Sequence, residues 1–521
     1  MGMSTPAPRT EEDTPMENIA RRHLPRLGAA ALGAAAAVTA APLAASAHPG
    51  DRTERTEDGA ADLLRRLRVP KGPATADGPV WSPLATGFAG VPTDSLPLGA
   101  AGGLGGPVVE VSTADELAAA LQLEGPVVVL VEGTLHVPLG TMLDISSSTS
   151  VLGVGRGAEI VGGGFRLLEV SDVVIRNLTF RDSYVPGDWD GKDDDNDNDG
   201  IRVDTSHHVW IDHCEFARLG DGQIDVRKDS TNVTVSWCVL RDHNKTLGVG
   251  WTDNVVTTLT LHHLWFSNTH QRNGSIDNVA LCHVYNCLLD GVSSYGMASR
   301  GASQLLIEHS VFDSVRNAIG ASDEDSRVAQ NGNVRDGSWG FWEDTGIDAD
   351  PADHYQYTLD PVDEVRALLD RHAGPHARKE KTPRRIHVAQ DGSGDVLSVH
   401  AAVGAAARAP HPVEILVHPG TYREVVTVWP GLDGLVIRGV SGDPNDVVLS
   451  YDKPAQDWAT VTVLASDVRL GALTLENTFD RSTGDEREAY PLRSADGSLM
   501  LEDVRLEGGP HEVSDPRAEQ G

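Results

Sequence analysis

The sequence predicts an all-β protein built as a right-handed parallel β-helix, a solenoid in which each coil stacks on the one before. A short strand pattern recurs through the middle of the chain, turn-forming residues separate its copies, and aromatic residues are scarce. The 521 residues include 54 Gly and 29 Pro, whereas aromatic residues make up only 5%. This composition favours short strands joined by many turns over helical packing.

The N-terminal region, residues 1–47, has the pattern of an export signal. Two consecutive arginines precede an Ala-rich stretch from Gly28 to Ala45, which runs into a small-residue cleavage site. The arginine pair resembles a twin-arginine signal, and an ordinary Sec signal is the alternative. We therefore expect a secreted protein in which residues 48–80 form a linker. No later segment is apolar enough to span a bilayer, so no membrane association is expected after the signal is removed.

The central region contains six copies of one strand pattern. The sixth residue of each copy serves as a marker, and these residues are Leu178, Cys214, Cys238, Leu264, Cys287 and Ser310. Successive markers are 36, 24, 26, 23 and 23 residues apart. A steady period without a helix-length segment between copies is typical of a solenoid, and apolar residues at alternate positions predict inner side chains that stack between coils.

The cysteines test this repeat, because equivalent residues of neighbouring coils lie about 4.8 Å apart. Cys214 and Cys238 occupy equivalent positions, so they form either a disulfide or a stack of small buried side chains. Cys282 and Cys287 lie five residues apart on one predicted strand. We expect these two side chains to point to opposite faces and not to pair.

Charged residues recur with nearly the same period beside the repeated strands. From Asp199 to Asp221 to Lys245 to Arg272 the steps are 22, 24 and 27 residues, and Asp225 follows Asp221 by four. We expect these side chains on one face over four coils, about 15 Å along the axis. Three converging carboxylates require a cation, and Ca²⁺ suits such hard oxygen ligands. The alternative is that some of these aspartates only cap turns.

Two further groups of residues invite a metal-binding interpretation. The tract from Gly187 to Gly200 is dense in Asp and Asn but lacks the Glu that closes an EF-hand loop, so a second calcium site and a solvated acidic insertion both remain open. Four histidines, His213, His243, His262 and His263, suggest zinc. No HExxH motif is present, and equivalent histidines in successive coils are explained by stacking without a metal.

Three segments carry a family resemblance: DNDGIRVDTSHHVWIDHCEF, DGQIDVRKDSTNVTVSWCVLRDHNKTLGVG and VTTLTLHHLWFSNTHQRN. In this order and at coil spacing, they resemble the central signature of the pectate lyase family, which also contains pectin lyases. The similarity runs from about Gly87 to about Val315, and we expect the β-helix domain to span residues 81–375. The resemblance implies a monomeric secreted enzyme that cleaves unesterified polygalacturonate, or pectin, by β-elimination.

The resemblance also assigns roles to the charged residues. It implies that Asp199, Asp221 and Asp225 bind Ca²⁺, that Lys245 binds a substrate carboxylate, and that Arg272 is the base. Removing the proton on carbon 5 of a uronate builds negative charge beside an ionised carboxylate, which a cation and a lysine would stabilise. An arginine base departs from the rule that guanidinium stays protonated, so this role rests on the resemblance.

The sequence departs from the family pattern after Arg272. The family commonly has a proline two residues on and a second arginine five residues on, whereas this chain has Gly274 and Asp277. The second substrate-binding arginine is therefore missing or supplied by another residue, for which Arg300 is the candidate. We expect that this difference weakens or alters the activity.

After a basic linker at residues 376–385, residues 386–521 resemble the beginning of pectin methylesterases, another β-helix family. An esterase would offer Gln-Asp-Thr after the strand LMLEDVRLEG, but Gly509–Glu512 occupy that site. The later catalytic residues are absent. We therefore expect a second, incomplete β-helix-like segment without esterase activity, which binds pectin, caps the solenoid or is poorly ordered.

The net charge of the chain limits the classes of function that the protein can have. The formal net charge of −33 argues against nucleic acid as a partner, because phosphate binding needs a basic surface. Two alternatives to a lyase remain: a polygalacturonase-type hydrolase with Asp221 and Asp225 as acid and base, and a non-catalytic pectin-binding protein. The basic pair Lys245 and Arg272 favours elimination.

Overall fold

The structure is a computed structural model that describes residues 59–68, 74–191, 196–376, 383–454, 459–480, 489–495, 498–509 and 511–513. The predicted export signal at residues 1–47 lies outside this part of the chain, as does most of the basic linker. A search of the described residues for a helix with the length and apolar character needed to cross a membrane finds none.

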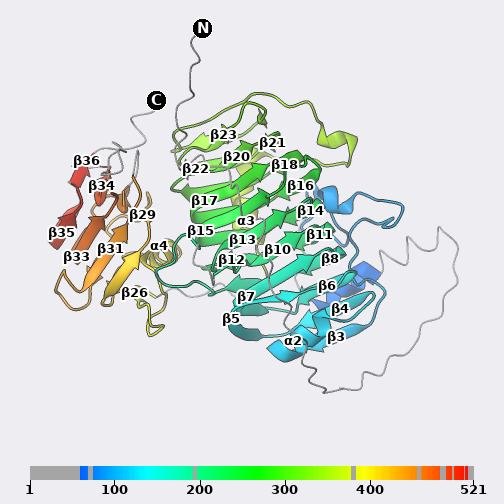
Figure 1. Ribbon diagram of the computed structural model, residues 1–521, viewed down its shortest axis with the longest axis horizontal. Coiled ribbons are helices and arrows are strands. Elements are labelled where there is room, and N and C mark those ends of the chain that lie inside the picture. The colour runs from blue at the N-terminus through cyan, green and yellow to red at the C-terminus, as the bar shows by residue number, and fades with distance from the viewer. Residues whose placement is uncertain are drawn as a thin grey trace, which may run out of the picture. The chain divides into compact units, whose positions relative to one another are not determined.

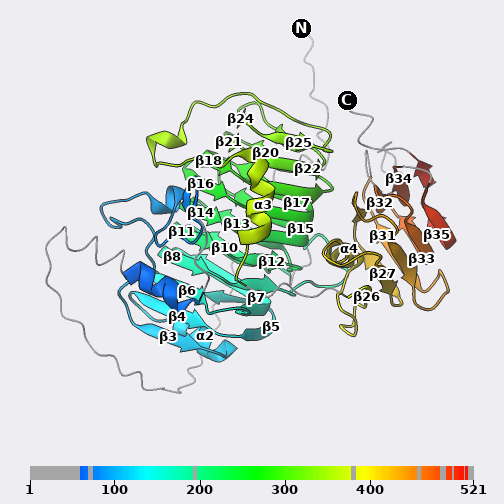
Figure 2. The same ribbon diagram turned by 180° about the vertical axis from the view of Figure 1, so that it is seen from behind.

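A parallel β-solenoid forms the larger part of the described chain, with two long sheets facing each other (Figures 1 and 2). The first sheet, sheet A, has ten strands: β3 Val108–Val111, β4 Val127–Val131, β6 Thr149–Gly153, β8 Ser171–Arg176, β11 His207–Asp212, β14 Thr231–Ser236, β16 Thr257–His262, β18 Val279–Tyr285, β21 Gln304–Glu308 and β24 Arg327–Asn331.

The second sheet, sheet B, has thirteen strands: β5 Thr134–Asp144, β7 Glu159–Leu168, β9 Thr179–Arg181, β10 Ile201–Asp204, β12 Glu215–Ala217, β13 Gly222–Arg227, β15 Val239–Gly250, β17 Trp265–Asp277, β19 Leu288–Val292, β20 Met297–Arg300, β22 Val311–Val315, β23 Ile319–Ala321 and β25 Val334–Asp336. Residues from the inner faces of both sheets form one continuous apolar core.

The predicted repeat is confirmed in register. The first residues of the six copies are hydrogen-bonded neighbours along sheet A, in the order Val173, Val209, Val233, Leu259, Cys282 and Leu305. The six marker residues are fully buried. Stacking equivalent apolar side chains on one another is what allows so short a repeat to enclose a core.

The fifth residue of each copy turns the chain from sheet A into sheet B. These residues are Asn177, His213, Trp237, His263, Asn286 and His309, and all have positive φ, between 42° and 60°. Bulky residues rarely adopt this left-handed conformation. Here the rings stack between coils: Trp81 lies on His213 at 3.6 Å and Trp237 on His263 at 4.0 Å. Stacking is thus confirmed for His213 and His263, with Trp237 between them.

All four cysteines are free and buried. The backbone N–H of Cys214 donates to the Sγ of Cys238 at 3.3 Å, so the stacked alternative holds and the disulfide does not form. The expectation that Cys282 and Cys287 point to opposite faces is wrong. The left-handed turn at Asn286 separates them, and both side chains enter the same core.

Short elements cover the solenoid. Helix α2, Ala114–Leu121, starts with a capping box in which Thr113 and Glu116 exchange hydrogen bonds, and it buries Leu117 and Leu121 in the core. The other elements are the hairpin β1 Ala74–Thr75 with β2 Gly78–Pro79, the 3₁₀ turns η2 Gly87–Gly90 and η3 Pro351–Asp353, and helix α3 Val362–His372.

Residues 383–513, the C-terminal module, form a second, smaller set of parallel strands with its own core. Helix α4, Val399–Ala407, precedes most of them. A seven-stranded sheet contains β26 Arg385–Val388, β27 Glu414–Val417, β28 Gly420–Arg423, β30 Val436–Gly439, β31 Val447–Tyr451, β33 Arg469–Asn477 and β35 Met500–Glu507. A four-stranded sheet contains β29 Val426–Val428, β32 Val461–Val463, β34 Leu492–Ser494 and β36 His511–Val513. The predicted β-helix-like character of this segment is confirmed.

Candidate active site

Sheet B places the charged residues predicted from the sequence on neighbouring strands. Gly222 of β13 pairs with Lys245 of β15, which pairs with Gln271 of β17. Asp221 therefore precedes this row of paired residues by one position, and Arg272 follows it by one. The coil-to-coil stacking brings together side chains that are far apart along the chain.

A second row carries the buried part of the site. Arg202 of β10 pairs with Asp225 of β13, and Asp225 pairs with Gly248 of β15. A Cβ atom added at Gly222 would lie 2.8 Å from Asp199 Oδ1 and 2.8 Å from Asp225 Oδ1. The missing side chain at Gly222 is what lets these two carboxylates approach, and its N–H donates to Asp199 Oδ1 at 2.8 Å.

Burial and neighbouring carboxylates shift the pKa values of Asp199 and Asp225. Burial raises the pKa of Asp199 well above its usual value, Asp225 and Asp221 act in the same direction, and Arg202 opposes them. Burial also raises the pKa of Asp225 to about 6, with Arg272 opposing and Asp221 reinforcing the shift. Like charges this close disfavour ionisation unless a cation is near.

Several features of these carboxylates fit a hard cation. Asp225 Oδ1 is buried without a hydrogen-bond partner, and Asp221 Oδ1 accepts from Lys245 Nζ at 2.5 Å. The oxygens of the three aspartates do not all lie within 4.8 Å of one another, so binding a cation between them requires small side-chain movements. Carboxylate oxygens are the ligands that Ca²⁺ takes, in flexible geometry.

Arg272 adopts the left-handed conformation, with φ at 57°. Its carbonyl oxygen accepts a hydrogen bond from Thr246 Oγ1 at 2.7 Å, which fixes this backbone. The guanidinium lies 5.7 Å from the ring centroid of Trp251. The same conformation recurs at turn residues of many coils, so at Arg272 it reflects the geometry of the solenoid and is held by the contact with Thr246.

Arg300 lies elsewhere on sheet B. It pairs with Asp277 of β17, five residues beyond Arg272, and its guanidinium packs over the ring of Tyr295 at 5.5 Å. Its Nε is buried without a hydrogen-bond partner. The structure therefore groups Asp199, Asp221, Asp225, Lys245 and Arg272, and places Arg300 apart from this group, opposite Asp277 on the neighbouring strand.

Sequence reasoning missed two residues of the site. Arg202 Nε donates to Asp199 Oδ2 at 2.6 Å, and its Nη2 donates to Asp197 Oδ1 at 2.6 Å. Trp251 carries two guanidinium groups over its ring, because Arg227 lies 5.6 Å from the centroid in addition to Arg272. Arg202 could have been found from its place one repeat before Asp225; no repeat marks Trp251.

Hydrogen bonds hold the acidic tract, Gly187 to Gly200, on each side of the four residues that the structure does not describe. Asn196 Nδ2 donates to Asp188 Oδ2 at 2.7 Å, and Arg423 of the C-terminal module donates to Asp190 Oδ2 at 2.8 Å. Residues 192–195 lie outside the described chain, so the question of a second calcium site stays open at this tract.

Comparison with known proteins identifies the family of this chain. A family model described as pectate lyase matches residues 79–376. A pectate trisaccharide-lyase of Thermotoga sp. (strain RQ2) is 35% identical over 332 residues, which are 55% of this chain and 88% of the relative. A pectate trisaccharide-lyase of Bacillus licheniformis is 29% identical over 298 residues, covering 53% of this chain and 83% of the relative.

Among solved structures, a pectate lyase from Bacillus sp. N165 in complex with trigalacturonate aligns with a TM-score of 0.48 and 23% identity, over 56% of this chain and 99% of that one. The family model covers more than half of the chain and includes every residue of the site described above. The chain belongs to the pectate lyase family.

Proposed function

We propose that this protein is a secreted pectate lyase that cleaves α-1,4-polygalacturonate by calcium-assisted β-elimination and releases 4,5-unsaturated oligogalacturonates. The observation that carries the proposal is that three buried or half-buried aspartates lie with Lys245 and Arg272 on adjacent strands of sheet B or in the turns just before them. A named relative, the pectate trisaccharide-lyase of Thermotoga, supports pectate as the substrate class.

Asp199, Asp221 and Asp225 would hold the cation. When bound, Ca²⁺ supplies a Lewis acid for the uronate carboxylate. Lys245, which is buried beside Asp221, adds a positive charge at the same carboxylate. A side chain fixed by an ion pair needs little reorganisation to stabilise charge that develops in the reaction.

Arg272 is the proposed proton acceptor. In the elimination, the proton on carbon 5 passes to the base, the bond between carbon 4 and the glycosidic oxygen breaks, and a double bond forms between carbons 4 and 5. The leaving oxygen takes up a proton. The Trp251 ring and the carbonyl contact with Thr246 hold Arg272 in one orientation.

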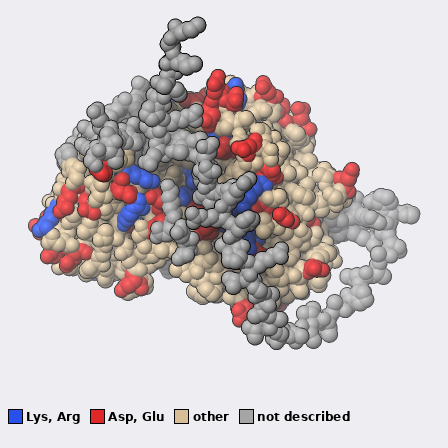
Figure 3. All heavy atoms as spheres, viewed as in Figure 1, with Lys and Arg blue, Asp and Glu red and all other residues tan. Residues whose placement is uncertain are grey.

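The distribution of charge is compatible with an anionic polymer. The chain has a net charge of −33, yet on the face shown in Figure 3 Lys and Arg side chains gather toward the middle of the view. A local group of cations can attract an anionic ligand to a protein of opposite overall sign. The net charge of −33 argues against nucleic acid, which needs a broad basic surface.

The hydrolase alternative is weaker. An inverting polygalacturonase needs one carboxylic acid to protonate the leaving group and one carboxylate to activate water. Asp221 Oδ1 is engaged in an ion pair with Lys245 Nζ at 2.5 Å, so this oxygen is not available to a leaving group. A non-catalytic pectin-binding protein would tolerate the loss of Arg272, so the presence of this arginine favours catalysis.

One assay separates these functions. The protein is incubated with polygalacturonate, with Ca²⁺ or with chelator, and ultraviolet absorbance of the unsaturated product is followed beside a reducing-end assay. We expect a calcium-dependent rise in absorbance that Arg272→Ala abolishes while polymer binding is retained. New reducing ends without absorbance would establish hydrolysis, and binding without either signal would establish a binding protein.

A further inference from the structure

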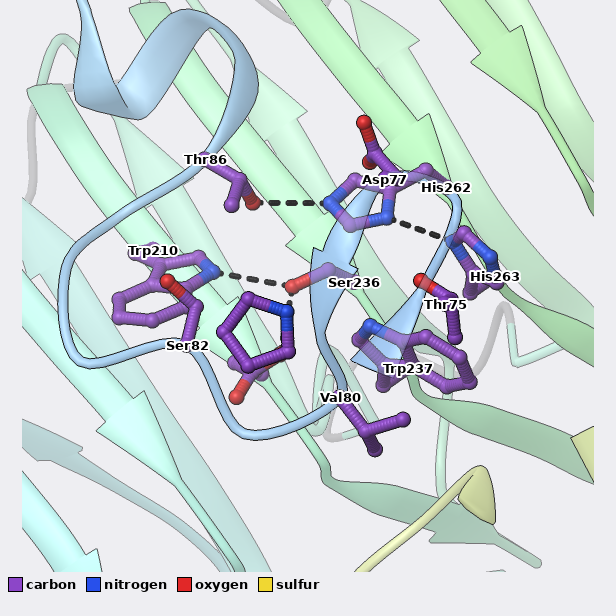
Figure 4. A pocket seen from close by; sticks show the side chains of 12 residues that line it. Thr75, Asp77, Val80, Ser82, Thr86, Trp210, Ser236, Trp237, His262 and His263 are labelled. Carbon is purple, nitrogen blue, oxygen red and sulfur yellow. Dashed lines mark hydrogen bonds between the residues drawn. The ribbon is translucent and has the colours of Figure 1, made fainter. Parts of the chain in front are cut away.

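A compact polar cluster lies on sheet A, away from the charged residues of sheet B. His262 and His263 stand at the end of β16, and Asp77 sits in the turn of the β1–β2 hairpin, which crosses these coils (Figure 4). One ligand atom from each of the three residues lies within 4.8 Å of the other two, and they are the only such trio of His, Cys, Asp or Glu in the part of the chain that the structure describes.

The two imidazoles face each other through the same nitrogen. His262 Nδ1 and His263 Nδ1 are 2.9 Å apart, and both rings are buried. Two nitrogen ligands on one Zn²⁺, each about 2.0–2.1 Å from the ion, lie about 3.3 Å apart at the tetrahedral angle. The two Nδ1 atoms are therefore about 0.4 Å closer than adjacent tetrahedral ligands, and a bound ion would move them slightly apart.

The Nε2 atom of each imidazole has a hydrogen-bond partner that orients the ring for metal binding. His263 Nε2 lies 3.0 Å from Asp360 Oδ2, and because a carboxylate only accepts, this nitrogen carries the proton and Nδ1 presents a lone pair. His262 Nε2 lies 2.8 Å from Thr86 Oγ1, which can accept as well as donate (Figure 4). A carboxylate or hydroxyl behind a histidine is the usual support of a metal-bound imidazole.

The faces of the two imidazole rings and the carboxylate of Asp77, the third ligand, are also held in place. Tyr285 stacks on His262 at 4.9 Å with the ring planes 5° apart, and Trp237 stacks on His263. The Tyr285 hydroxyl donates to Asp77 Oδ2 at 2.7 Å. Burial raises the pKa of Asp77, and a cation beside it would offset the cost of ionising it there. The stacking expected from the sequence uses the ring faces and leaves the nitrogens free to converge.

The cluster borders a cavity. Asp77, Thr86, His262 and His263 line it, and its volume is about 30 Å³. This is room for an ion with one water molecule. Two nitrogens and one carboxylate oxygen make a borderline-soft donor set, which favours Zn²⁺ or a similar transition metal over the Ca²⁺ proposed for sheet B.

We infer that Asp77, His262 and His263 form a second, transition-metal site, suited to Zn²⁺, that fastens the N-terminal hairpin to the solenoid. Binding needs a change of tautomer at His262, whose proton moves from Nδ1 to Nε2, where Thr86 Oγ1 accepts it. It also needs side-chain shifts that bring the three ligand atoms, which lie within 4.8 Å of one another, to coordination distance. Both Nδ1 lone pairs then face the ion, and Asp77 supplies the third ligand.

The test uses the full-length protein with Ca²⁺ in excess, so that the aspartates of sheet B do not compete. Zn²⁺ is titrated by calorimetry and Co²⁺ by its visible absorption, and unfolding is followed with and without Zn²⁺. We expect one bound equivalent, cobalt bands of a nitrogen- and oxygen-ligated ion, and a higher unfolding midpoint with Zn²⁺. Asp77→Asn should weaken Zn²⁺ binding about tenfold or more and remove the rise in midpoint.

The matched control is His207→Gln. His207 and His208 repeat the same contact, with their Nδ1 atoms 2.8 Å apart, but no third ligand joins them within the described chain. This variant should bind Zn²⁺ like the unmodified protein. If Asp77→Asn does not fold, His262→Gln and the cobalt spectrum of the unmodified protein decide. Failure of the unmodified protein to bind either ion would reduce the cluster to a hydrogen-bond network, as would equal binding by Asp77→Asn and His262→Gln.

Discussion

At the scale of single residues, Lys245 has two roles: it forms an ion pair with Asp221, and we propose that it binds a substrate carboxylate. Its ammonium group is paired with Asp221 Oδ1 at 2.5 Å, although Asp221 is one of the three aspartates proposed to bind Ca²⁺. Its side chain is nearly buried, with 6% exposed. A lysine in this position competes with the cation for Asp221 and is at the same time placed beside the carboxylate that the cation would bind.

Replacing Lys245 with Ala should therefore separate calcium binding from turnover. We expect Ca²⁺ to bind as tightly as before or more tightly, because a neighbouring positive charge is removed. Turnover should fall about 100-fold, the usual effect of deleting one group that stabilises developing charge. Calorimetric titration of Ca²⁺ and the absorbance assay measure the two effects.

A suitable control is Lys228→Ala, since Lys228 is 51% exposed and pairs with Asp204 outside the group of site residues. It should alter neither calcium binding nor turnover. Loss of calcium affinity in Lys245→Ala together with loss of turnover would mean that Lys245 mainly maintains the shape of the site.

At the scale of the structural elements, Glu308 at the end of β21 joins the solenoid to the segment that follows it. His283 Nε2 lies 3.0 Å from its Oε2, and Asn331 Nδ2 and the Tyr357 hydroxyl each donate to it at 2.8 Å. Burial alone would raise the pKa of Glu308, but these hydrogen bonds lower it to about 2. Its carboxylate thus stabilises the fold only while it is ionised.

This pKa sets the direction of a pH effect on stability. The unfolded chain holds the proton more tightly than the folded chain, so the contribution of Glu308 is complete above about pH 4.5 and is lost as the pH falls toward 2. Glu308→Gln should lower the free energy of unfolding at pH 7 by about 1–2 kcal/mol, after allowance for solvent screening. Its unfolding curves between pH 5 and pH 3, roughly the range of carboxylate titration, should depend less on pH. An unchanged slope would show that other carboxylates govern acid unfolding.

The order and register of the repeated strands could be predicted from the sequence. Strand copies repeat because each coil must place an apolar side chain on the one below, so the register from Val173 to Leu305 was predictable from the spacing alone. The grouping of Asp221, Lys245 and Arg272 followed from the same repeat. Asp77 could not be placed, because it meets His262 through a hairpin that belongs to no repeat. The direction of the Cys287 side chain could not be predicted either, because it depends on the left-handed conformation that Asn286 adopts in the folded chain.

At the scale of the molecule, the C-terminal module is docked on the strands that carry the proposed catalytic residues. Asn268 of β17 donates through Nδ2 to the carbonyl of His400 at 3.0 Å and accepts from Trp429 Nε1 at 3.0 Å. Arg408 Nη2 donates to Asp242 of β15 at 2.7 Å, and the Asp242 side chain is fully buried. Buried polar groups that are satisfied across a contact indicate a specific interface rather than a loose tether.

Gly404 of α4 offers a sharp test of this docking. A Cβ atom there would lie 1.7 Å from Asp242 Oδ1 and 2.5 Å from Asn268 Nδ2. Gly404→Ala should favour the isolated helix by about 1 kcal/mol, because alanine is the better helix former. In the whole protein the same change must displace the module. We expect calorimetry to show two unfolding transitions in place of one cooperative transition, and lower turnover because β15 and β17 lose a shared support.

Gly471→Ala is the matched control within the same module, because the nearest atom to its added Cβ is 3.5 Å away. It should leave both the unfolding profile and turnover unchanged. A single transition at a higher temperature in Gly404→Ala would mean that helix propensity dominates and that α4 does not dock as described. Two transitions with full turnover would separate the two roles: the module would be docked through Asp242 and Asn268, yet the strands carrying Lys245 and Arg272 would keep their geometry without it.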